Sequence, residues 1–555
     1  IERLACAIRD AGLAAGDRVA LISVDRVDWI VADFATLFAG CVIVPLFPTQ
    51  ALDHVHFILE NSAAKLVFVD TAEAAQRLRS TPGNLAHLVV FDGEAEGCES
   101  LASFEARGAQ LLSAHPEWPS AFETEVRPDD LAVLMYTSGT TGLPKGVRLS
   151  HDNVGFTAKS SFAFAFEEIE RDAPVLSVLP FSHIYEHSIM YGYLLSGMRH
   201  YIVHSVDELL TDLRDVRPTA MTVVPRIFER MLAGIAFKAQ AAGGFRARVV
   251  PWALATGRAY MTVKTRGGRP GPLLALRYAL ARVLVLKKIR PLLGLDRLGF
   301  FVSGSAPLHF DTAMTFLGFG VPIIEGYGPT ECSPVITVNR LKSNRYGTVG
   351  KPIPGVQIKL APDGEILARG RNVMQGYYRD DASTAAVMDD GWYKTGDIGE
   401  IESDGYLRIT DRKKELFKTS GGKFVAPARV ESAIKRSPYV NQVMLVGDGR
   451  AHPAALVAPN WELLKPKLDL PANASPADLA SRADVLAFLT ADVHKQTADL
   501  ATFEQVRRIA VLPNELTIEA GELSPTLKVK RRVVESRYAA EIERVYAEPI
   551  HGAHA

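Results

Sequence analysis

Tyr136-Thr-Ser-Gly-Thr-Thr-Gly-Leu-Pro-Lys-Gly146 carries more information about the fold than any other stretch of this 555-residue chain. A hydrophobic run, Leu131-Ala-Val-Leu-Met135, precedes it, so we expect a buried strand that leads into a polar, glycine-rich turn. Such a turn can offer backbone N–H groups, hydroxyls and the Lys145 ammonium to a polyphosphate. The stretch therefore indicates ATP and chemistry on phosphates.

The two commonest nucleotide motifs do not fit this stretch. A Walker A loop places its lysine after a glycine and before Ser or Thr, whereas Lys145 follows Pro144 and precedes Gly146. The chain also lacks the Gly-x-Gly-x-x-Gly fingerprint of a dinucleotide site. Taken alone, the stretch could also be an ordinary surface loop rich in small residues.

Composition describes a folded protein that is too long for one core. The chain is 48% hydrophobic and 23% charged, which is typical of globular proteins, and its length predicts roughly two to four domains. The formal net charge is −1, so the chain has no overall bias towards polyanions, and we expect no nucleic acid as a partner. No apolar stretch reaches the roughly 18 residues of a membrane-spanning helix.

The cysteines and the first residues of the chain indicate in which cellular compartment the protein is found. Cys6, Cys41, Cys98 and Cys332 are scattered without a Cys-x-x-Cys pair, which argues against structural zinc or a disulfide scaffold. We interpret them as small buried hydrophobes of a cytoplasmic protein. The chain opens inside an amphipathic helical pattern and without methionine, so we expect that its true N-terminus, with any targeting signal, is missing.

Strand-like and helix-like segments alternate over residues 1 to about 230. The expected strands are 19–23, 42–46, 66–69 and 88–91, and the expected helices are 28–39 and 53–62. A second alternating block has strands at 300–302 and 321–324. This alternation predicts mostly parallel sheets covered by helices.

The sequence pattern changes after about residue 345. Short strands separated by turns such as Pro362-Asp-Gly364 predict a small, antiparallel, β-barrel-like unit up to residue 410. A charged pentad, Asp411-Arg-Lys-Lys-Glu415, then leads into a small α+β domain over 416–545 and a tail over 546–555. The predicted fold class is therefore α/β, with a large N-terminal domain over 1–410 and a small C-terminal domain.

Six motifs occur in the order found in the adenylate-forming superfamily, which comprises acyl-CoA synthetases, adenylation domains of peptide synthetases, and luciferases. Residues 136–146 resemble its phosphate loop. The other five are Phe301-Val-Ser-Gly-Ser-Ala-Pro-Leu308, Glu325-Gly-Tyr-Gly-Pro-Thr-Glu331, Tyr393-Lys-Thr-Gly-Asp397, Asp411–Glu415 and Pro525-Thr-Leu-Lys528. The resemblance covers nearly the whole chain and is closest to AMP-forming long-chain fatty acyl-CoA synthetases.

The resemblance implies a site for ATP or AMP. Tyr327, between two glycines, can lie flat against adenine, and Asp397 can accept hydrogen bonds from the ribose hydroxyls. Glu331, with Thr141, would hold Mg²⁺, which prefers one or two carboxylates plus phosphate oxygens. The nucleotide-binding residues that it implies are Thr137, Ser138, Gly139, Thr140, Thr141, Gly142, Lys145, Gly304, Ser305, Ala306, Glu325, Gly326, Tyr327, Gly328, Thr330, Asp397 and Arg412.

The catalytic residues implied by the resemblance are Lys528, Thr137, Glu331 and His183. When a carboxylate attacks the α-phosphate, two anions approach, and a lysine between them stabilises the transition state. We expect Lys528 to take this role, although a lysine in such a basic segment would usually be solvated. Lys145 belongs to the pyrophosphate side.

The same resemblance implies the acyl pocket, the CoA channel and the hinge. His183, in Leu179-Pro-Phe-Ser-His183, would lie near the mouth of the acyl pocket, and Val224 and Pro225 would line it. Each of these is otherwise an ordinary core residue. Gly422 would line the pantetheine channel, and the C-terminal domain would swing about Lys414 between two half-reactions.

Segment 226–297 is strongly basic. It contains fifteen Lys or Arg residues but only Glu229 and Asp296 as acids. Within it, 273–293 mixes leucines with basic residues, which is typical of a helix on an anionic membrane surface but also of a solvated helix face. We therefore expect a cytoplasmic protein with possible peripheral contact at the inner face of a membrane.

The implied activity is that of an AMP-forming long-chain fatty acid–CoA ligase. Fatty acid and ATP give acyl-AMP and pyrophosphate, and coenzyme A then gives acyl-CoA and AMP. The alternatives are a fatty acyl-AMP ligase that loads a carrier protein, a synthetase for medium-chain or aryl acids, a luciferase-like oxidase, and a noncatalytic binding module. The last would be expected to lose Lys528, Glu331 or Asp397, and all three are present.

Overall fold

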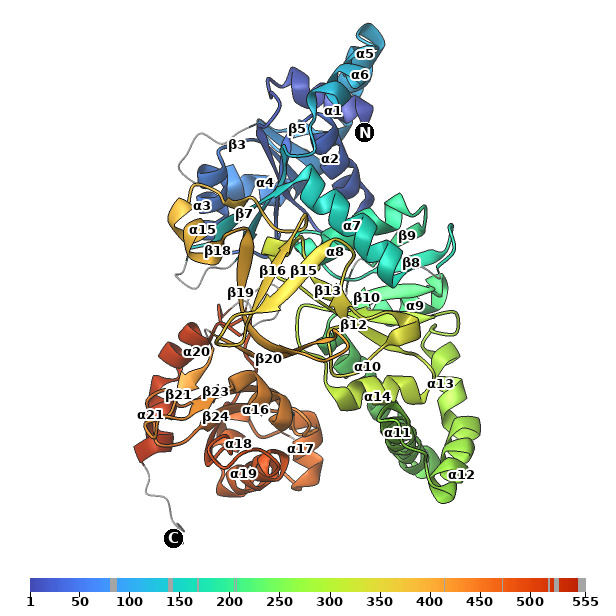
Figure 1. Cartoon of the computed structure of the whole chain (residues 1–555), viewed down its shortest axis with the longest axis vertical. Helices are drawn as coiled ribbons and strands as arrows, with labels where there is room; N and C mark the ends of the chain where they lie inside the picture. The colour runs from blue at the N-terminus through green and yellow to red at the C-terminus, as the bar shows by residue number, and fades with distance from the viewer. Residues whose placement is uncertain are drawn as a thin grey trace. The chain divides into compact units, whose positions relative to one another are not determined.

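The computed structural model describes residues 1–79, 87–137, 143–166, 169–203, 205, 207–413, 415–471, 473–517, 520–523 and 529–547. The chain packs into two compact units (Figure 1). The first comprises residues 1–361, 367–395 and 401–408, and the second comprises 362–366, 396–400 and 409–555.

The first sheet of the first unit has eight strands. Its order is β17 (Gly376–Tyr377), β7 (Lys145–Ser150), β6 (Leu131–Thr137), β2 (Val42–Leu46), β1 (Arg18–Ile22), β3 (Ala64–Thr71), β4 (His87–Asp92) and β5 (Glu99–Ser100). The strands from β6 to β5 pair in parallel, whereas β7 and β17 pair antiparallel at one edge. The long connections of parallel strands are the helices that cover this sheet.

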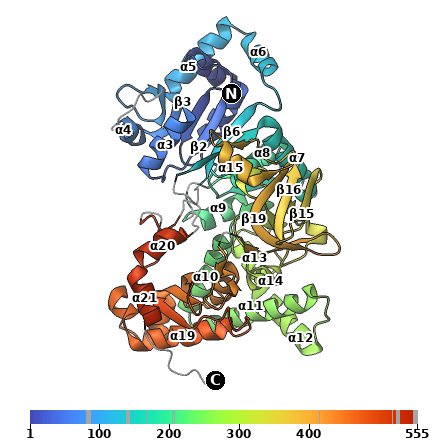
Figure 2. The same cartoon turned by 60° about the vertical axis from the view of Figure 1, so that its left-hand side comes forward.

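Alternate residues of these strands enter two different cores. On β1, Val19 and Leu21 face a cluster that includes α1 (Glu2–Asp10), α2 (Val27–Phe38) and α5 (Leu101–Ala114). Ala20 and Ile22 face the opposite cluster, beneath α3 (Leu52–Ser62) and α4 (Ala72–Arg79). Because successive strand side chains point to opposite faces, apolar runs rather than alternating patterns mark strands buried on both sides. Figure 2 shows α3 and α4 together on one side of this sheet.

The second sheet has seven strands. Its order is β14 (Lys351–Pro352), β13 (Thr337–Val338), β12 (Ile323–Tyr327), β11 (Phe300–Ser303), β10 (Ala220–Val223), β8 (Pro174–Ser177) and β9 (Arg199–Ile202). The strands from β12 to β9 pair in parallel, and β13 and β14 are antiparallel. The helices connecting or following these strands are α8 (Ile184–Leu195), α9 (Leu209–Val216), α10 (Pro225–Ala241), α11 (Gly244–Thr265), α12 (Pro272–Ala281), the π-helical turn η1 (Arg282–Leu286), α13 (Lys287–Leu292) and α14 (Phe310–Gly318).

One core joins the two sheets. It takes Val19 and Phe68 from the first sheet, Val175 and Val302 from the second, and residues of α8 and of α7 (His151–Ala165). Three buried polar side chains, Asp33, His187 and Tyr191, contact one another across this core. The Tyr191 hydroxyl donates to Asp33 of α2 (2.8 Å) and lies 2.7 Å from His187 Nε2. Buried polar groups are costly unless they are hydrogen-bonded, so this group fixes how α8 packs on α2.

A five-stranded sheet follows in the order β15 (Val356–Leu360), β16 (Glu365–Gly370), β19 (Trp392–Ile401) and β18 (Met388–Asp389), with β20 (Leu407–Arg412) paired to β19. Helix α15 (Asp381–Val387) precedes β18, and the Asp380 carboxylate caps it by accepting from the Ser383 N–H. The remaining elements of the first unit are α6 (Trp118–Glu125), η2 (Thr330–Cys332) and η3 (Leu341–Ser343).

The second unit is a small α+β unit. Its three-stranded sheet has the order β23 (Val440–Val446), β24 (Ala454–Pro459) and β25 (Arg508–Val511), and a two-stranded sheet pairs β21 (Phe417–Lys418) with β22 (Phe424–Val425). The helices are α16 (Pro427–Ile434), α17 (Trp461–Lys467), α18 (Pro476–Ala480), α19 (Ala483–Thr497), α20 (Arg531–Arg537) and α21 (Ala539–Ala547).

The predicted fold class is confirmed. The strands expected at 19–23, 42–46, 66–69, 88–91 and 300–302 are β1, β2, β3, β4 and β11, and the strand expected at 321–324 begins two residues later as β12. The cysteine expectation is right for three of the four, because Cys98 is only half-buried. Within the described residues, no helix is long and apolar enough to cross a membrane.

Glu186 of α8 makes the stability of the first unit depend on pH. The residue is fully buried, Thr222 donates to its carboxylate at 2.8 Å, and desolvation raises its pKa from 4.5 to about 8. Unfolded chains release this proton near pH 4.5, while the folded protein retains it, so the stabilisation is complete below pH 4.5 and is lost as the pH rises towards 8.

Glu186→Gln should therefore flatten the pH dependence of the melting temperature between pH 5 and about 8. Glutamine keeps the acceptor for Thr222 but cannot ionise. In calorimetric scans, the wild type should lose more stability than the variant over this interval, by on the order of a few kcal/mol at most. Parallel pH profiles for the two proteins would show that Glu186 is not protonated in the fold.

Candidate functional site

Four parallel strands of the second sheet end at one edge, and predicted site residues lie at or just after these strand ends. His183 follows β8, Val224 and Pro225 follow β10, and Gly304 follows β11. Tyr327 is the last residue of β12. The register pairs Val223 with Ser303 and Ser303 with Glu325, so these chain exits lie side by side. The carboxyl edge of a parallel sheet is the usual place for a ligand site in α/β proteins.

Two glycines at this edge permit close approaches that a side chain would block. A Cβ atom on Gly328 would lie 2.0 Å from the Pro334 carbonyl oxygen, and one on Gly304 would lie 2.9 Å from the Tyr185 ring. Both distances are below van der Waals contact, so only glycine fits without displacement. The glycines therefore let the chain after β11 and β12 fold tightly against neighbouring segments. Between these two turns, Ser305 adopts a left-handed backbone with φ of +66°.

Glu331 is fixed by a tyrosine from a distant segment. The Tyr377 hydroxyl donates to Glu331 Oε1 at 2.7 Å, and the Glu331 carbonyl accepts from Met374 N at 2.8 Å. Tyr393, which is buried, lies beside the same pair. Burial, reinforced by the charge of Glu331, raises the pKa of both tyrosines above its ordinary value. A half-buried carboxylate in a defined orientation results.

Lys145 joins this group from the other sheet. Its ammonium lies 5.3 Å from the centre of the Tyr377 ring, 2.5 Å from Ser383 Oγ and 3.8 Å from an Asp380 oxygen. The structure thus brings Lys145 to the ring, and Glu331 to the hydroxyl, of one tyrosine side chain. A polyphosphate that approached Lys145 would compete with Asp380 for its charge.

The predicted phosphate loop lies largely outside the described residues. Ser138, Gly139, Thr140, Thr141 and Gly142 belong to that part, while Thr137 and Lys145 are the two paired ends of β6 and β7. Because Thr137 is opposite Lys145 in the antiparallel ladder, the loop leaves and re-enters the sheet at one point. Thr137 is half-buried at the end of β6.

Glu325 is a second carboxyl group at the sheet edge. It lies on β12, its backbone carbonyl accepts from Asn339 N at 2.8 Å, and desolvation raises its pKa from 4.5 to about 8. Backbone N–H groups of Leu308 and Gly347 donate to it and oppose this shift. The raised pKa favours the protonated carboxyl group, which can offer a hydrogen-bond donor rather than a negative charge.

The predicted acyl pocket residues lie at the start of two helices. His183 caps α8, with Nδ1 accepting from Tyr185 N at 3.2 Å, and Pro225 is the first residue of α10. Pro225 is buried, and Val224 packs against a core formed by α9, α10, α11, η1 and α13. Proline at the first helical position costs no hydrogen bond, which explains the abrupt change from β10 to α10.

Asp397 and Arg412 meet within the second unit. Arg412 Nε lies 3.1 Å from Asp397 Oδ1, and Asp397 is only 7% exposed. The next residue, Lys413, donates to Glu365 at 2.9 Å and pairs with Asp363 at 2.6 Å. Each basic residue of Asp411-Arg412-Lys413 that the structure describes is therefore paired with an acid of β19 or β16 or of the turn before β16. Lys414, the predicted hinge residue, lies outside the described residues.

Gly422 and the ends of the segment that carries Lys528 also belong to this unit. Gly422 has a left-handed backbone with φ of +78° in the turn between β21 and β22, where a side chain would be strained. Residues 524–528, including Lys528, lie outside the described part of the chain. Leu523 and Val529 on either side of them form an antiparallel bridge, and Arg531 is anchored to Glu431 at 2.5 Å.

Sequence reasoning missed Tyr377, Tyr393 as a partner of Glu331, and Tyr185 beneath Gly304. Tyr377 stands in Gln375-Gly-Tyr-Tyr378, and a glycine followed by two aromatic residues was the only available signal. The predicted residues of the first unit gather at the carboxyl edge, with Gly326 and Thr330 half-buried and Ala306 exposed. Asp397, Arg412 and Gly422 form a separate set in the second unit.

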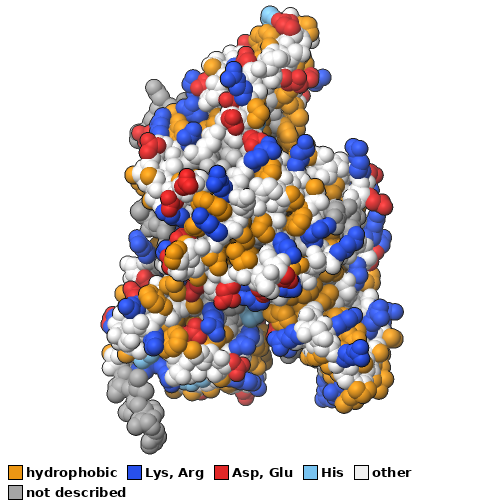
Figure 3. Space-filling model, in the orientation of Figure 1, with side chains coloured by type: hydrophobic (Ala, Val, Ile, Leu, Met, Phe, Trp, Pro, Cys, Tyr) orange, Lys and Arg blue, Asp and Glu red, His pale blue; other side chains and the backbone are white. Residues whose placement is uncertain are grey.

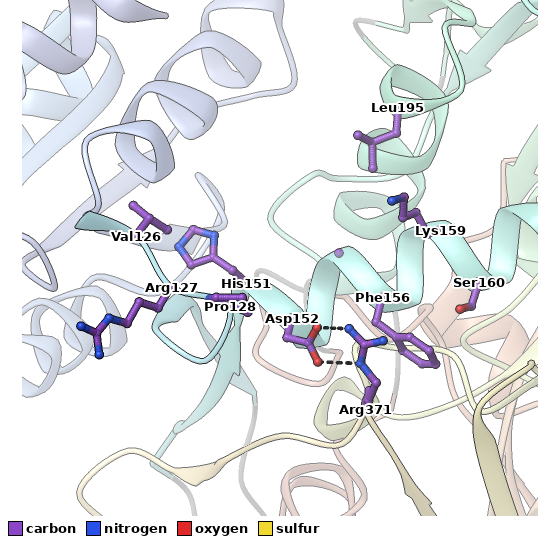
Figure 4. Close-up of a pocket in the computed structure, with 11 residues that line it drawn as sticks. Val126, Arg127, Pro128, His151, Asp152, Phe156, Lys159, Ser160, Leu195 and Arg371 are labelled. Atoms are coloured by element: carbon purple, nitrogen blue, oxygen red, sulfur yellow. Dashed lines mark hydrogen bonds and ion pairs between the residues drawn. The ribbon is translucent and has the colours of Figure 1, made fainter. Parts of the chain in front are cut away.

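A surface groove of about 690 Å³ lies elsewhere on the first unit (Figure 4). Arg371, one of its lining residues, is neutralised by Asp152, and its guanidinium lies 5.0 Å from the centre of the Phe156 ring. None of the predicted site residues lines this groove. Its size alone therefore does not make it the site.

Comparison with known proteins adds an independent line of evidence about the family of this chain. The family model described as AMP-binding enzyme matches residues 1–378, and the model described as AMP-binding enzyme C-terminal domain matches residues 415–549. The chain is 35% identical to the long-chain-fatty-acid–CoA ligase FadD15 of Mycobacterium bovis, covering 98% of this chain and 90% of that protein. It is 30% identical to the long-chain-fatty-acid–CoA ligase ACSBG2 of Gallus gallus, covering 96% and 74%.

A solved structure shares the fold. It is the O-succinylbenzoate Coenzyme A Synthetase (MenE) of Bacillus subtilis in complex with ATP and magnesium ion. The TM-score is 0.67 at 21% identity, and the alignment covers 96% of this chain and 92% of that one.

Tyr377→Phe should weaken nucleotide-dependent activity while leaving the fold intact. Phenylalanine keeps the ring beneath Lys145 and removes only the hydroxyl that orients Glu331. Loss of a hydrogen bond to a charged group costs roughly 1.5–3 kcal/mol, so kcat/KM for ATP should fall about tenfold or more.

The matched control is Tyr378→Phe, because Tyr378 is the adjacent tyrosine and its ring lies against Arg379 instead. Steady-state pyrophosphate release at varied ATP, with thermal melts of both variants, separates the two. If both variants lost activity equally, the Tyr377–Glu331 contact would have no special role.

Proposed function

This chain belongs to the family of AMP-binding enzymes, and on that premise we propose that it is an AMP-forming long-chain fatty acid–CoA ligase. Its substrates are a fatty acid, ATP with Mg²⁺, and coenzyme A. The observation that carries the proposal is identity of 35% over 98% of the chain to a long-chain-fatty-acid–CoA ligase. The convergence of the nucleotide and acyl residues on one sheet edge supports it.

The first half-reaction joins the carboxylate to the α-phosphate. A carboxylate oxygen attacks phosphorus, the bond to the pyrophosphate oxygen breaks, and acyl-AMP and pyrophosphate result. We propose that Lys528 neutralises the approaching anions and that Lys145 contacts the pyrophosphate side. Thr137, at the end of β6, would contribute its hydroxyl to the same phosphates.

The nucleotide is proposed to lie along the carboxyl edge of the second sheet. Tyr327 would stack on adenine next to Gly304, Ser305 and Ala306, and the protonated Glu325 would donate a hydrogen bond there. Asp397, held by Arg412, would accept from the ribose hydroxyls. His183, Val224 and Pro225 would border the acyl chain, since they follow the neighbouring strands β8 and β10.

The residues at Glu331 fit a magnesium ion. The carboxylate is half-buried and fixed by Tyr377, and no three His, Cys, Asp or Glu side chains cluster in the described ranges. One carboxylate completed by phosphate oxygens and water suits Mg²⁺. Bound there with Thr141, it would offset charge on the phosphate oxygens. The Tyr377 hydroxyl would keep the Glu331 oxygens oriented towards it.

The second half-reaction needs only access for a thiol. The thiolate sulfur attacks the acyl carbon, the carbon–oxygen bond breaks, and AMP leaves with both electrons. No protein nucleophile is required, because the mixed anhydride is already activated. We propose that the domain over 416–545 reorients about Lys414, within the hinge 411–415, and that Gly422 then lines the pantetheine channel.

A panel of acids tests the function. Purified protein with ATP, Mg²⁺ and acids from two to twenty carbons should release pyrophosphate best with long chains, and free coenzyme A should yield acyl-CoA and AMP. Adenylate without thioester would favour a fatty acyl-AMP ligase that serves a carrier protein. A maximum at medium-chain or aryl acids would favour a synthetase for those acids.

Lys528→Ala should abolish acyl-AMP formation and leave the conversion of supplied acyl-AMP to acyl-CoA largely intact. The lysine acts where charge builds on phosphoryl oxygens, and removing such a group costs roughly 10²–10³-fold in rate. Single-turnover assays of each half-reaction measure the two rates separately. Equal losses in both would contradict the assigned role.

Gly422→Leu should give the opposite pattern. A side chain would narrow the proposed channel, so acyl-AMP should form while thioester formation falls roughly tenfold or more. Gly405→Leu is the matched control, because Gly405 also has a left-handed φ, +88°, and open space around its Cβ position. The same half-reaction assays measure both rates. A normal rate of thioester formation by Gly422→Leu would show that Gly422 does not line the channel.

We also propose a location. The protein would act in the cytoplasm, with segment 226–297 in peripheral contact with the inner face of a membrane. The excess of thirteen basic residues over this segment supports the contact. A substrate that partitions into bilayers would then be taken up next to its source.

A further inference from the structure

Helix α12 and the π-helical turn η1 expose an apolar face. Leu273, Leu276, Leu280 and Val283 are 66%, 69%, 53% and 63% exposed, and their spacing of three and four residues places them on one side of the helix. We call these four residues the apolar ridge. Exposed apolar side chains are ordinary when scattered, but a contiguous row of them marks an interaction surface.

The opposite side of the same helix is firmly packed. Ala281, Val285 and Leu286 are buried, and Tyr278 stacks on Tyr260 of α11 with ring centres 4.1 Å apart. Both views show α11 and α12 running side by side as a hairpin (Figures 1 and 2). The ridge is therefore presented outward by a rigid support and is not the frayed edge of a loose helix.

Basic side chains border the ridge. Arg277, Arg282, Lys287 and Lys288 are all exposed, and none has an ion-pair partner among the residues that the structure describes. We call these four the basic flank. Figure 3 shows blue and orange side chains together on the lobe that α11, α12 and α13 form, with few red ones.

Arg290 does not belong to the basic flank. Its guanidinium donates to the backbone carbonyls of Leu295, Gly320, Asp296 and Leu298 at 2.7 to 3.3 Å. Arg258 and Arg230 also have acidic partners, Asp311 and Asp207. The structure thus corrects the simplest interpretation of segment 226–297, because only part of its positive charge is available to a partner.

We propose that the apolar ridge and the basic flank dock this protein on an anionic lipid bilayer. The leucines enter the boundary between headgroups and acyl chains, and the basic flank contacts the lipid phosphates. A helix with an apolar face between basic residues binds an interface in this way, through buried apolar area and through attraction to anionic lipid. This proposal deepens the proposed function, on which its link to the substrate rests.

Charge and position favour a bilayer over a protein partner. The segment carries fifteen basic and two acidic residues, and the exposed charges of the basic flank all have one sign, so this face complements an anionic surface. The buried residues beneath the ridge, Ala281 and Val285, belong to the same core cluster as Val223 and Ile227, on either side of the proposed acyl pocket residues Val224 and Pro225. Docking there would bring the acyl pocket close to the lipid that holds the fatty acid.

Vesicle co-sedimentation tests the proposal directly. The wild type should bind vesicles of phosphatidylcholine with 30% phosphatidylglycerol (about one charged lipid in three) and should bind pure phosphatidylcholine much less. Leu273→Ser/Leu276→Ser/Leu280→Ser should lower the partition coefficient roughly tenfold or more. Arg277→Gln/Lys287→Gln/Lys288→Gln should lower it by a similar factor and remove most of its salt dependence.

Matched controls change the same number of residues elsewhere. Val27→Ser/Leu463→Ser/Leu486→Ser removes three exposed apolar side chains, and Lys435→Gln/Lys467→Gln/Lys495→Gln removes three exposed charges. Both controls should bind as the wild type does.

A fluorophore sensitive to its environment measures insertion into the bilayer. It is attached to Leu276→Cys in a Cys98→Ser background, because the other three cysteines are buried. Its emission should shift to the blue on anionic vesicles.

Three outcomes would overturn the proposal. They are absence of vesicle binding by the wild type, equal losses in ridge and control variants, and a ridge-dependent dimer in sedimentation velocity without lipid. The proposed function is read separately, as pyrophosphate release with a water-soluble medium-chain acid in the absence of vesicles. That rate should be unchanged in the ridge variant, so a failed ligase and a failed membrane contact cannot be confused.

Discussion

Parallel pairing of β8, β10, β11 and β12 is the constraint on which the site depends. Strands that run in the same direction end at the same edge, so segments far apart in the sequence leave the sheet together. His183, Val224, Gly304 and Tyr327 become neighbours for this reason alone. No long-range contact between their side chains is needed to bring them there, and the surrounding loops can vary while the arrangement persists.

Polar contacts within the first unit then set the chemistry of this edge. Tyr377 orients Glu331, and the same ring lies beneath Lys145, so a carboxylate and an ammonium are held at fixed places around one side chain. Lys145 is meanwhile close to Asp380. Binding of a polyphosphate would exchange one anionic partner for another, which costs less than desolvating a free lysine.

The sequence predicted the sheets well, because strands buried on both faces read as short apolar runs between glycines and polar turns. It could not predict the Tyr377–Glu331 contact, since the two residues are separated by 46 positions and no periodicity links them. It also could not separate Arg290 from its basic neighbours. All of them read as positive charge, and only the fold shows that Arg290 donates to backbone carbonyls while the leucines of the apolar ridge face outward.

One measurement tests the central claim most directly. Fatty acid labelled with ¹⁸O in both carboxyl oxygens is incubated with the protein, ATP, Mg²⁺ and coenzyme A, and the AMP is analysed by mass spectrometry. If the carboxylate attacks the α-phosphate and the thiol then breaks the acyl carbon–oxygen bond, each AMP carries one ¹⁸O atom. AMP without label, formed together with acyl-CoA, would contradict an acyl-adenylate and the site built to make it.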